Sequence, residues 1–195
     1  MKKLHTLLLM LSLLMSSVAV ALAYEEAPRE EPAKVIQSAI IKLNQLTGMA
    51  TYSPQMMRFL VEREITPLFD FEYIVNEVSA GSVNLNKEEF KYFSSLLKKN
   101  IINTLLERLA QGQSKSFNFI SARPAMGGDI IIVRLNAKGF FRFGFNLDLS
   151  FHQNQANKWQ VFDVALNYDS LINYYQRMVR SKVRRYGVYG MLGRI

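Results

Sequence analysis

Side chains suited to acid–base or nucleophilic chemistry are scarce in this chain. The sequence has no cysteine and two histidines, His5 near the N-terminus and His152. No disulfide can form, and zinc sites of the usual His/Cys kind are excluded. His152 ends an alternating apolar segment and precedes the polar run at residues 153–155. We expect it to be a solvated residue at the edge of a loop, not a catalytic base.

Three other groups could serve an enzyme that uses one acid or base in an apolar site: Asp148, Asp163 and Tyr168. Asp148 falls on the polar side of the alternating segment. Asp163 follows a shift in the alternation between Val161 and Phe162, so its carboxylate is expected to accept backbone N–H groups beside a bulge. Neither a catalytic pair of carboxylates nor a Gly-x-Ser-x-Gly motif accompanies them. These absences count against an enzyme. A small-molecule isomerase or hydrolase with an apolar cavity is therefore only the alternative prediction.

The segment from Phe141 to Phe151 alternates strictly between apolar and polar residues. This period of two predicts a β-strand with one buried and one solvated face. The buried face has to be covered by protein alone or by protein together with an apolar ligand. On composition alone, ordinary core is the commoner case, as in an interaction domain with a filled interior. The apolar face comprises Phe141, Phe143, Phe145, Leu147, Leu149 and Phe151.

Helical and alternating periods divide the rest of the chain into a helical half and a strand-rich half. Helices are predicted at residues 33–46, from Ser53 to just before Pro67, from Asp70 to about residue 80, at 86–110, and from Ser170 onward. Strands are predicted at residues 116–122, 129–137, 140–152 and 158–168. Their short linkers predict hairpins. The expected fold is α+β, with a four-stranded antiparallel meander packed against N-terminal helices and a C-terminal helix.

The N-terminus has the pattern of an export signal. Lys2 and Lys3 precede an apolar stretch at residues 4–15, and Ala21-Leu22-Ala23 fits a cleavage site. We therefore predict a signal peptide at 1–23, a flexible acidic leader at 24–32 and one domain at 33–195. Cleavage would lower the formal net charge from +8 to +6.

The remaining positive charge is concentrated at the C-terminus. From Asp169 onward that residue is the only acid, against six basic residues. In an exported protein such a cluster suits acidic protein surfaces or anionic lipid, and we expect no nucleic-acid partner. Cations are also favoured near the C-terminal end of any solvated helix. The predicted docking residues are Arg177, Arg180, Lys182, Arg184 and Arg185.

Two stretches of the sequence resemble the MlaC family, the periplasmic phospholipid carriers of Gram-negative bacteria. They are Pro67-Leu68-Phe69-Asp70-Phe71-Glu72, and Trp159-Gln160-Val161-Phe162-Asp163-Val164 followed by Ser170-Leu171-Ile172-Asn173-Tyr174-Tyr175. The resemblance extends over the whole mature chain in order and spacing. Two features depart from the family. Leu68 stands where members commonly have His, and residues 153–158 replace a Gly-rich stretch.

The resemblance implies a monomeric carrier without cofactor or enzymatic activity. It would hold one phospholipid by its acyl tails in an apolar cavity. It would exchange that lipid between an outer-membrane lipoprotein–porin complex and an inner-membrane MCE-domain ABC transporter, and so maintain outer-membrane lipid asymmetry. The expected cavity walls are Phe69, Phe71, Leu97, Ile101, Leu105, Phe117, Phe119, Val133, Leu135, Phe141, Phe143, Phe145, Leu147, Leu149, Leu171, Ile172 and Tyr175.

Overall fold

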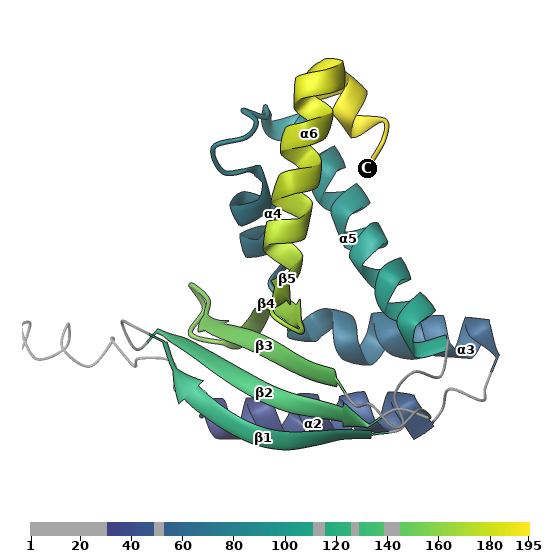
Figure 1. Cartoon of the computed structure of the whole chain (residues 1–195), viewed down its shortest axis with the longest axis vertical. Coiled ribbons are helices and arrows are strands. Elements are labelled where there is room, and N and C mark those ends of the chain that lie inside the picture. Colours follow the sequence, from purple (N-terminus) through teal and green to yellow (C-terminus); the bar gives the residue numbers. More distant parts are fainter. Residues whose placement is uncertain (1–30, 49–52, 111–115, 126–128, 139–144) are drawn as a thin grey trace, which may run out of the picture.

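The structure is a computed structural model that describes residues 31–48, 53–110, 116–125, 129–138 and 145–195. The predicted signal peptide and most of the predicted leader lie outside these residues. The α+β class is confirmed, because helices pack against one antiparallel sheet. Figure 1 shows α2 lying along the sheet, whereas α4, α5 and α6 rise from its β4–β5 end.

The helices occur where the apolar periodicity predicts them. They are α2 (Pro32–Gly48), α3 (Pro54–Leu60), α4 (Phe71–Ser79), α5 (Lys87–Ala110) and α6 (Leu171–Leu192). One detail differs from the prediction between Ser53 and Pro67. After α3 the chain continues as a π-helical turn, η1 (Val61–Ile65), and a 3₁₀ turn, η2 (Thr66–Leu68). Pro67 has no N–H to donate, so an α-helical ladder cannot run through it unchanged.

The sheet has five strands instead of four, and their order in space is their order in the chain. They are β1 (Ser116–Pro124), β2 (Ile130–Lys138), β3 (Phe145–Gln153), β4 (Trp159–Leu166) and β5 (Asp169–Ser170). The strand predicted at 158–168 stops early because Asn167 and Tyr168 adopt positive φ angles of 46° and 73°. This turn sends the chain back as β5, which leads directly into α6.

The predicted helix starts are confirmed by their capping bonds. Asp70 Oδ1 accepts a hydrogen bond from the Tyr73 N–H at 2.9 Å. Asn86 and Glu89 form the reciprocal capping box, with both side chain–backbone distances at 2.9 Å. Ser170 Oγ accepts from the N–H of Asn173 at 3.1 Å and so begins α6.

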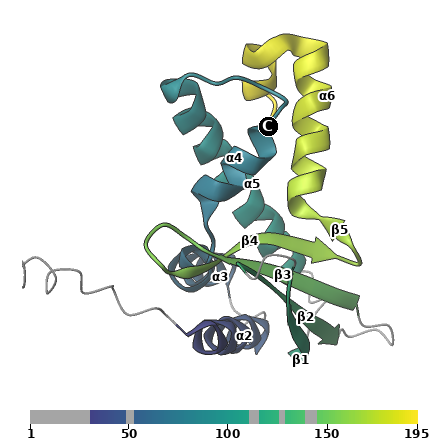
Figure 2. The ribbon, with the colours of Figure 1, turned by 90° about the vertical axis from the view of Figure 1, so that its left-hand side faces the viewer.

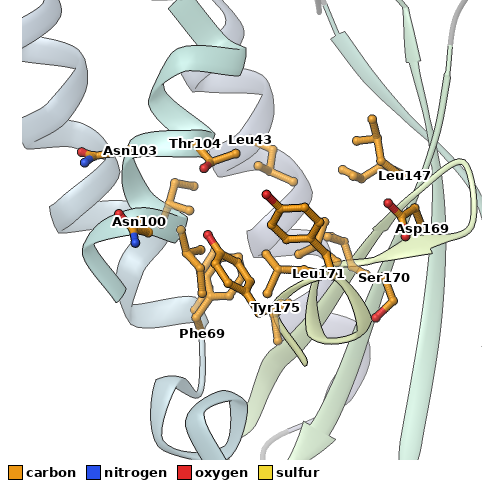
Figure 3. A pocket seen from close by; sticks show the side chains of 18 of the residues that line it. Leu43, Phe69, Asn100, Asn103, Thr104, Leu147, Asp169, Ser170, Leu171 and Tyr175 are labelled. Carbon is orange, nitrogen blue, oxygen red and sulfur yellow. The ribbon is translucent and has the colours of Figure 1, made fainter. Parts of the chain in front are cut away.

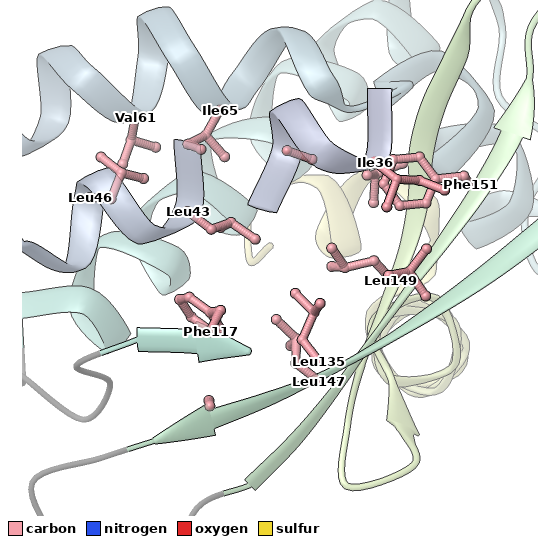
Figure 4. Packing of buried hydrophobic residues seen from close by; sticks show 14 of the residues in the cluster. Ile36, Leu43, Leu46, Val61, Ile65, Phe117, Leu135, Leu147, Leu149 and Phe151 are labelled. Carbon is pink, nitrogen blue, oxygen red and sulfur yellow. The ribbon is translucent and has the colours of Figure 1, made fainter. Parts of the chain in front are cut away.

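The alternation of β3 is confirmed over its described part. Leu147, Leu149 and Phe151 are buried, and Asp148 lies between them on the opposite face. The buried face looks toward α2 and η1 (Figure 4). Phe141 and Phe143 lie outside the described residues.

Asn44 of α2 fixes the helix to the outer edge of β1. Its side-chain amide donates to the Phe117 carbonyl at 3.0 Å and accepts from the Phe117 N–H at 2.7 Å. The amide thereby supplies the two bonds that a neighbouring strand would otherwise make at this edge. The position of α2 across the inner face of the sheet is therefore set by a specific polar contact as well as by packing.

Two hydrophobic clusters divide the interior. The first joins α2, η1 and the inner face of the sheet, and the second joins α4, α5 and α6. Figure 2 shows the second group of helices standing apart from α2. Phe69 and Phe71 pack against both clusters, with ring centroids 5.6 Å apart. They lie at the boundary between the two cores.

The segment before α4 is attached to β4 by backbone bonds. Phe69 forms a parallel bridge with Val161, and the Asp70 N–H donates to the Val161 carbonyl at 2.9 Å. The Gln160 side-chain amide also donates to the carbonyls of Pro67 and Phe69. Together these bonds anchor the start of α4 to the sheet.

The prediction that His152 is solvated is wrong. Its side chain is 12 % exposed, and Nε2 lies 3.0 Å from Oδ2 of Asp70. The ring also packs against Tyr73 and Phe162, with centroid distances of 4.2 and 5.2 Å. Phe162 reaches this site because a bulge in β4 displaces it from the alternation. His152 therefore joins the sheet to α4.

An apolar cavity between the two cores

A cavity of about 660 Å³ lies where the two hydrophobic clusters meet. It is bounded by the inner face of β3 and β4, by α2, by α5 and by the beginning of α6 (Figure 3). Its volume falls within the range of about 300–1,000 Å³ that small-molecule sites occupy. Its lining comprises Ala39, Leu43, Ile65, Leu68, Phe69, Asn100, Ile101, Asn103, Thr104, Glu107, Phe117, Phe145, Leu147, Leu149, Val161, Val164, Leu166, Asp169, Ser170, Leu171, Tyr174, Tyr175 and Met178.

The apolar walls of the cavity follow from strand pairing. Leu147 lies opposite Leu166, and Leu149 lies opposite Val164, so two adjacent strands present aliphatic side chains to one side. Because successive side chains of a strand alternate between faces, these residues share the inner face of the sheet. Leu43 closes the wall from α2.

Polar side chains are concentrated on two elements at the rim. Asn100, Asn103, Thr104 and Glu107 recur along α5 at helical spacing, so they share one side of that helix. Asp169 faces the same cavity from β5, directly before α6 begins. The site therefore combines an aliphatic interior with a polar border.

Contacts at the rim hold these polar groups. Arg177 Nη2 lies 3.0 Å from Asp169 Oδ1, and both side chains are exposed. Arg58 Nη2 donates to Asn103 Oδ1 at 3.1 Å.

Burial raises the pKa of the Tyr175 hydroxyl, although a hydrogen bond with Thr104 acts in the opposite direction. Tyr175 therefore stays protonated at neutral pH and can serve as a hydrogen-bond donor at the cavity wall.

The groups considered for catalysis do not line this cavity. Asp148 lies on the outer face of the sheet, where Arg134 donates to its two oxygens at 2.7 and 2.6 Å. This pairing lowers the pKa of Asp148. Asp163 Oδ1 accepts from the N–H groups of Val164 and Ile172 at 2.9 and 3.1 Å, which confirms its expected role beside a bulge. Tyr168 is 75 % exposed.

The structure brings together eight of the predicted cavity residues: Phe69, Ile101, Phe117, Phe145, Leu147, Leu149, Leu171 and Tyr175. Others lie elsewhere. Val133 and Leu135 are buried in the first core, whereas Leu97 and Ile172 are buried in the second. Phe71 packs between the two cores.

Phe119 lies outside this cavity. It is 54 % exposed and borders a separate groove of about 810 Å³ between β1 and the first half of α2. Phe141, Phe143 and the side chain of Leu105 fall outside the described part of the chain.

Sequence reasoning missed two parts of the site. The inner face of β4 was overlooked because the bulge at Phe162 interrupts its alternation. The apolar run from Val161 to Leu166 was the available signal. The polar side of α5 was also missed, although Asn100, Asn103 and Glu107 recur at intervals of three and four.

The predicted docking residues lie along α6. Arg177 is paired with Asp169, and Arg180, Arg184 and Arg185 are exposed. Lys182 is half-buried and donates to the carbonyl of Arg194.

Among the described helices, none combines the length and apolarity needed to cross a bilayer. The described residues also contain no cluster of three or more His, Asp or Glu side chains suited to a metal ion.

The fold and the cavity define an α+β protein with an internal apolar site. The MlaC protein family model matches residues 33–195, and the chain therefore belongs to the MlaC family. Six chains of solved structures match as well. One is the phospholipid-binding protein from Ralstonia solanacearum, solved in complex with a phospholipid, at 18 % identity and a TM-score of 0.72. The match covers 84 % of this chain and 94 % of that one. No curated protein matches the sequence.

Proposed function

We propose that the mature protein carries one phospholipid through the periplasm, with the acyl tails in the cavity and the head group at the polar rim. The observation that carries this proposal is the aliphatic cavity bordered by polar groups of α5 and β5. Family membership and the phospholipid bound by the Ralstonia protein support it. We further propose that residues 1–23 direct export and are removed.

The energetics explain why such a carrier is needed. Each methylene that leaves an apolar environment for water costs about 0.8 kcal/mol, so a two-tailed lipid does not cross water unaided. For the lipid tails, the aliphatic walls of the cavity replace the apolar interior of the bilayer by another apolar environment. Transfer between bilayer and protein then approaches neutrality, and the lipid can be taken up and released.

The partners proposed for this exchange are an outer-membrane lipoprotein–porin complex and an inner-membrane MCE-domain ABC transporter. Such exchange would maintain outer-membrane lipid asymmetry. The docking residues on α6 would contribute to at least one of these encounters, because Arg180, Arg184 and Arg185 are exposed and available for acidic surfaces.

Native mass spectrometry of the purified mature protein tests lipid carriage. We expect an added mass equal to that of one phospholipid, lost on denaturation. Phe145→Asp places a charge at the cavity wall and should abolish lipid retention. Phe59→Asp makes the same change at an exposed position of α3 and should retain the lipid. A protein that is repeatedly free of lipid would refute the proposal.

Filling the cavity provides a second test that adds no charge. Ala39 is 1 % exposed and lines the cavity from α2. Ala39→Phe should reduce bound lipid, because the ring would take up space needed by the tails. Gln45→Phe, at an exposed position of the same helix, is the matched control. Equal lipid content in both variants would place the tails elsewhere.

A further inference from the structure

The last residues of α6 fold back on the helix instead of extending it. Gly187 has φ 69° and ψ 178°, which breaks the helical path. After this reversal Met191 and Leu192 are buried in the second core. Two tyrosines are left on the outside, with exposed fractions of 50 % for Tyr186 and 79 % for Tyr189. The reversal lies at the end of the molecule opposite the sheet (Figure 1).

Positive charge surrounds these tyrosines. The segment from Ser170 to the C-terminus contains six basic residues and no acid. Among the described residues, no carboxylate pairs with any of the four arginines near the reversal. We call this surface the C-terminal tip; it comprises Arg180, Arg184, Arg185, Tyr186, Tyr189 and Arg194.

Contacts within the tip hold part of it in place. The guanidinium of Arg194 lies 4.4 Å from the centroid of the Tyr186 ring, and its Nη1 donates to the carbonyl of Gly190 at 3.0 Å. Favourable placement of cations at a helix C-terminus accounts for some of the charge. It does not account for two tyrosines directed into solvent, where their rings contribute little to the core.

We propose that the C-terminal tip binds the surface of a bilayer that contains anionic lipid. This inference rests on the proposed carrier function, whose proposed partner complexes lie in membranes. Tyrosine rings favour the head-group layer, where the ring is partly desolvated and the hydroxyl stays hydrated. Each Lys or Arg near an anionic surface strengthens binding by about fivefold. The strongly exposed ring of Tyr189 projects outward, as a contact with a soft head-group layer requires.

The C-terminal tip lies far from the cavity, so membrane recruitment of the protein and transfer of its lipid would involve different parts of the molecule. Counting both ends, α6 has sixteen residues from Leu171 at the cavity to Tyr186 at the tip. At a rise of about 1.5 Å per residue they span roughly 24 Å. When the tip touches a bilayer with α6 upright, the cavity rim stays clear of the surface. The tip would thus raise the local concentration of the carrier without itself opening the cavity.

Vesicle co-sedimentation of the full mature protein tests the inference. We expect binding to vesicles of phosphatidylcholine and phosphatidylglycerol, weakened by salt, and little binding to phosphatidylcholine alone. Arg184→Gln/Arg185→Gln should weaken binding about 25-fold. The control Lys138→Gln/Lys158→Gln removes the same charge from exposed positions at the end of β2 and directly before β4, and it should change binding by less than about twofold.

A fluorescence experiment checks which residue meets the membrane. Trp159, on β4, is the one tryptophan of the chain. Tyr189→Trp adds a second at the tip, and brominated lipid should quench that additional emission while leaving the parent protein unquenched. Tyr189→Ala should weaken vesicle binding, whereas Tyr92→Ala, at an exposed position of α5, should not.

The outcomes separate this inference from the carrier function. Absence of vesicle binding, or equal loss in both charge variants, would overturn the bilayer contact; in the first case an acidic protein surface would be the favoured partner. Native mass spectrometry of the same variants reports lipid carriage independently. If the tip variants keep one phospholipid but bind vesicles like the parent, the tip inference fails and the carrier function stands. If vesicles bind but no phospholipid is retained, the carrier function fails instead.

Discussion

His152 Nε2 and Asp70 Oδ2 lie 3.0 Å apart although 82 residues separate them in the chain. The same aspartate caps α4 through its other oxygen. One carboxylate therefore begins a helix and ties that helix to the sheet. The contact joins the two halves of the molecule close to the phenylalanines that lie between the cores.

Substitution of Asp70 separates its two roles. Asp70→Ala should lower the free energy of unfolding by about 2–3 kcal/mol, because it removes both the cap and the bond to His152. Asp70→Ser keeps a capping oxygen and should cost about 1–2 kcal/mol. Urea unfolding measures both. Asn86→Ala, which removes only the cap of α5, should cost about 1 kcal/mol. Wild-type stability in Asp70→Ser would show that the contact with His152 contributes nothing.

The Arg134–Asp148 pair predicts a stability loss in acid. Hydrogen bonds from Arg134 lower the pKa of Asp148 in the folded protein. The pair therefore stabilises the fold above the unfolded-state pKa of about 3.9, and this contribution is lost as pH falls through the lower folded value. Between about pH 4 and 2 the wild type should lose more stability than Asp148→Asn.

Urea midpoints measured across this pH range check the Asp148 prediction. Asp129→Asn, at an exposed position near the start of β2, serves as the control and should follow the wild-type curve. Parallel curves for the wild type and Asp148→Asn would contradict the assignment.

Removal of the Asn44 amide should release the edge of β1. Asn44→Ala leaves the N–H and the carbonyl of Phe117 without their side-chain partner and should cost about 1–3 kcal/mol. Hydrogen exchange should show a loss of protection at the Phe117 amide. Gln45→Ala, at the exposed neighbouring position, should preserve that protection. Unchanged exchange in Asn44→Ala would mean that packing alone holds α2.

The reversal at Gly187 should depend on glycine. Its backbone angles, φ 69° and ψ 178°, lie in a region that other residues rarely adopt, so Gly187→Ala should destabilise by about 1–3 kcal/mol. An added Cβ would meet no atom within 4 Å, so the cost comes from the backbone. Gly193 has φ −78° and room for a Cβ, and Gly193→Ala should be nearly neutral. Thermal unfolding that shows equal effects would contradict the prediction.

The sequence predicts those features that depend on nearby residues. Caps such as Asp70 and Ser170 act within one turn, and the alternation of β3 is a property of one strand, so both were visible before the structure. The environment of His152 could not be predicted, because its partner Asp70 lies at the start of a helix that is distant in the sequence. The role of Asp163 beside a bulge could be predicted from the sequence, because the disturbed alternation around Phe162 is itself local.

The cavity could likewise be predicted only in part from the sequence. Leu149 could be placed on an inner face from its strand alone, but whether that face meets core or an open space depends on how α2 and α5 approach it. Val133 has the same alternating pattern and is packed into the first core. Periodicity gives the face of a side chain, whereas tertiary packing decides what that face contacts.

The strand order of the sheet has a consequence for how the protein folds. Each strand pairs with its neighbour in the chain, so the sheet can form as successive hairpins that close only short loops. The bonds from Asn44 to Phe117 and from Asp70 to His152 instead cross 73 and 82 residues. The N-terminal helices are synthesised before these partners, so their apolar faces stay uncovered until the later strands have been made. Of all parts of the molecule, the N-terminal half should depend most on protection during biogenesis.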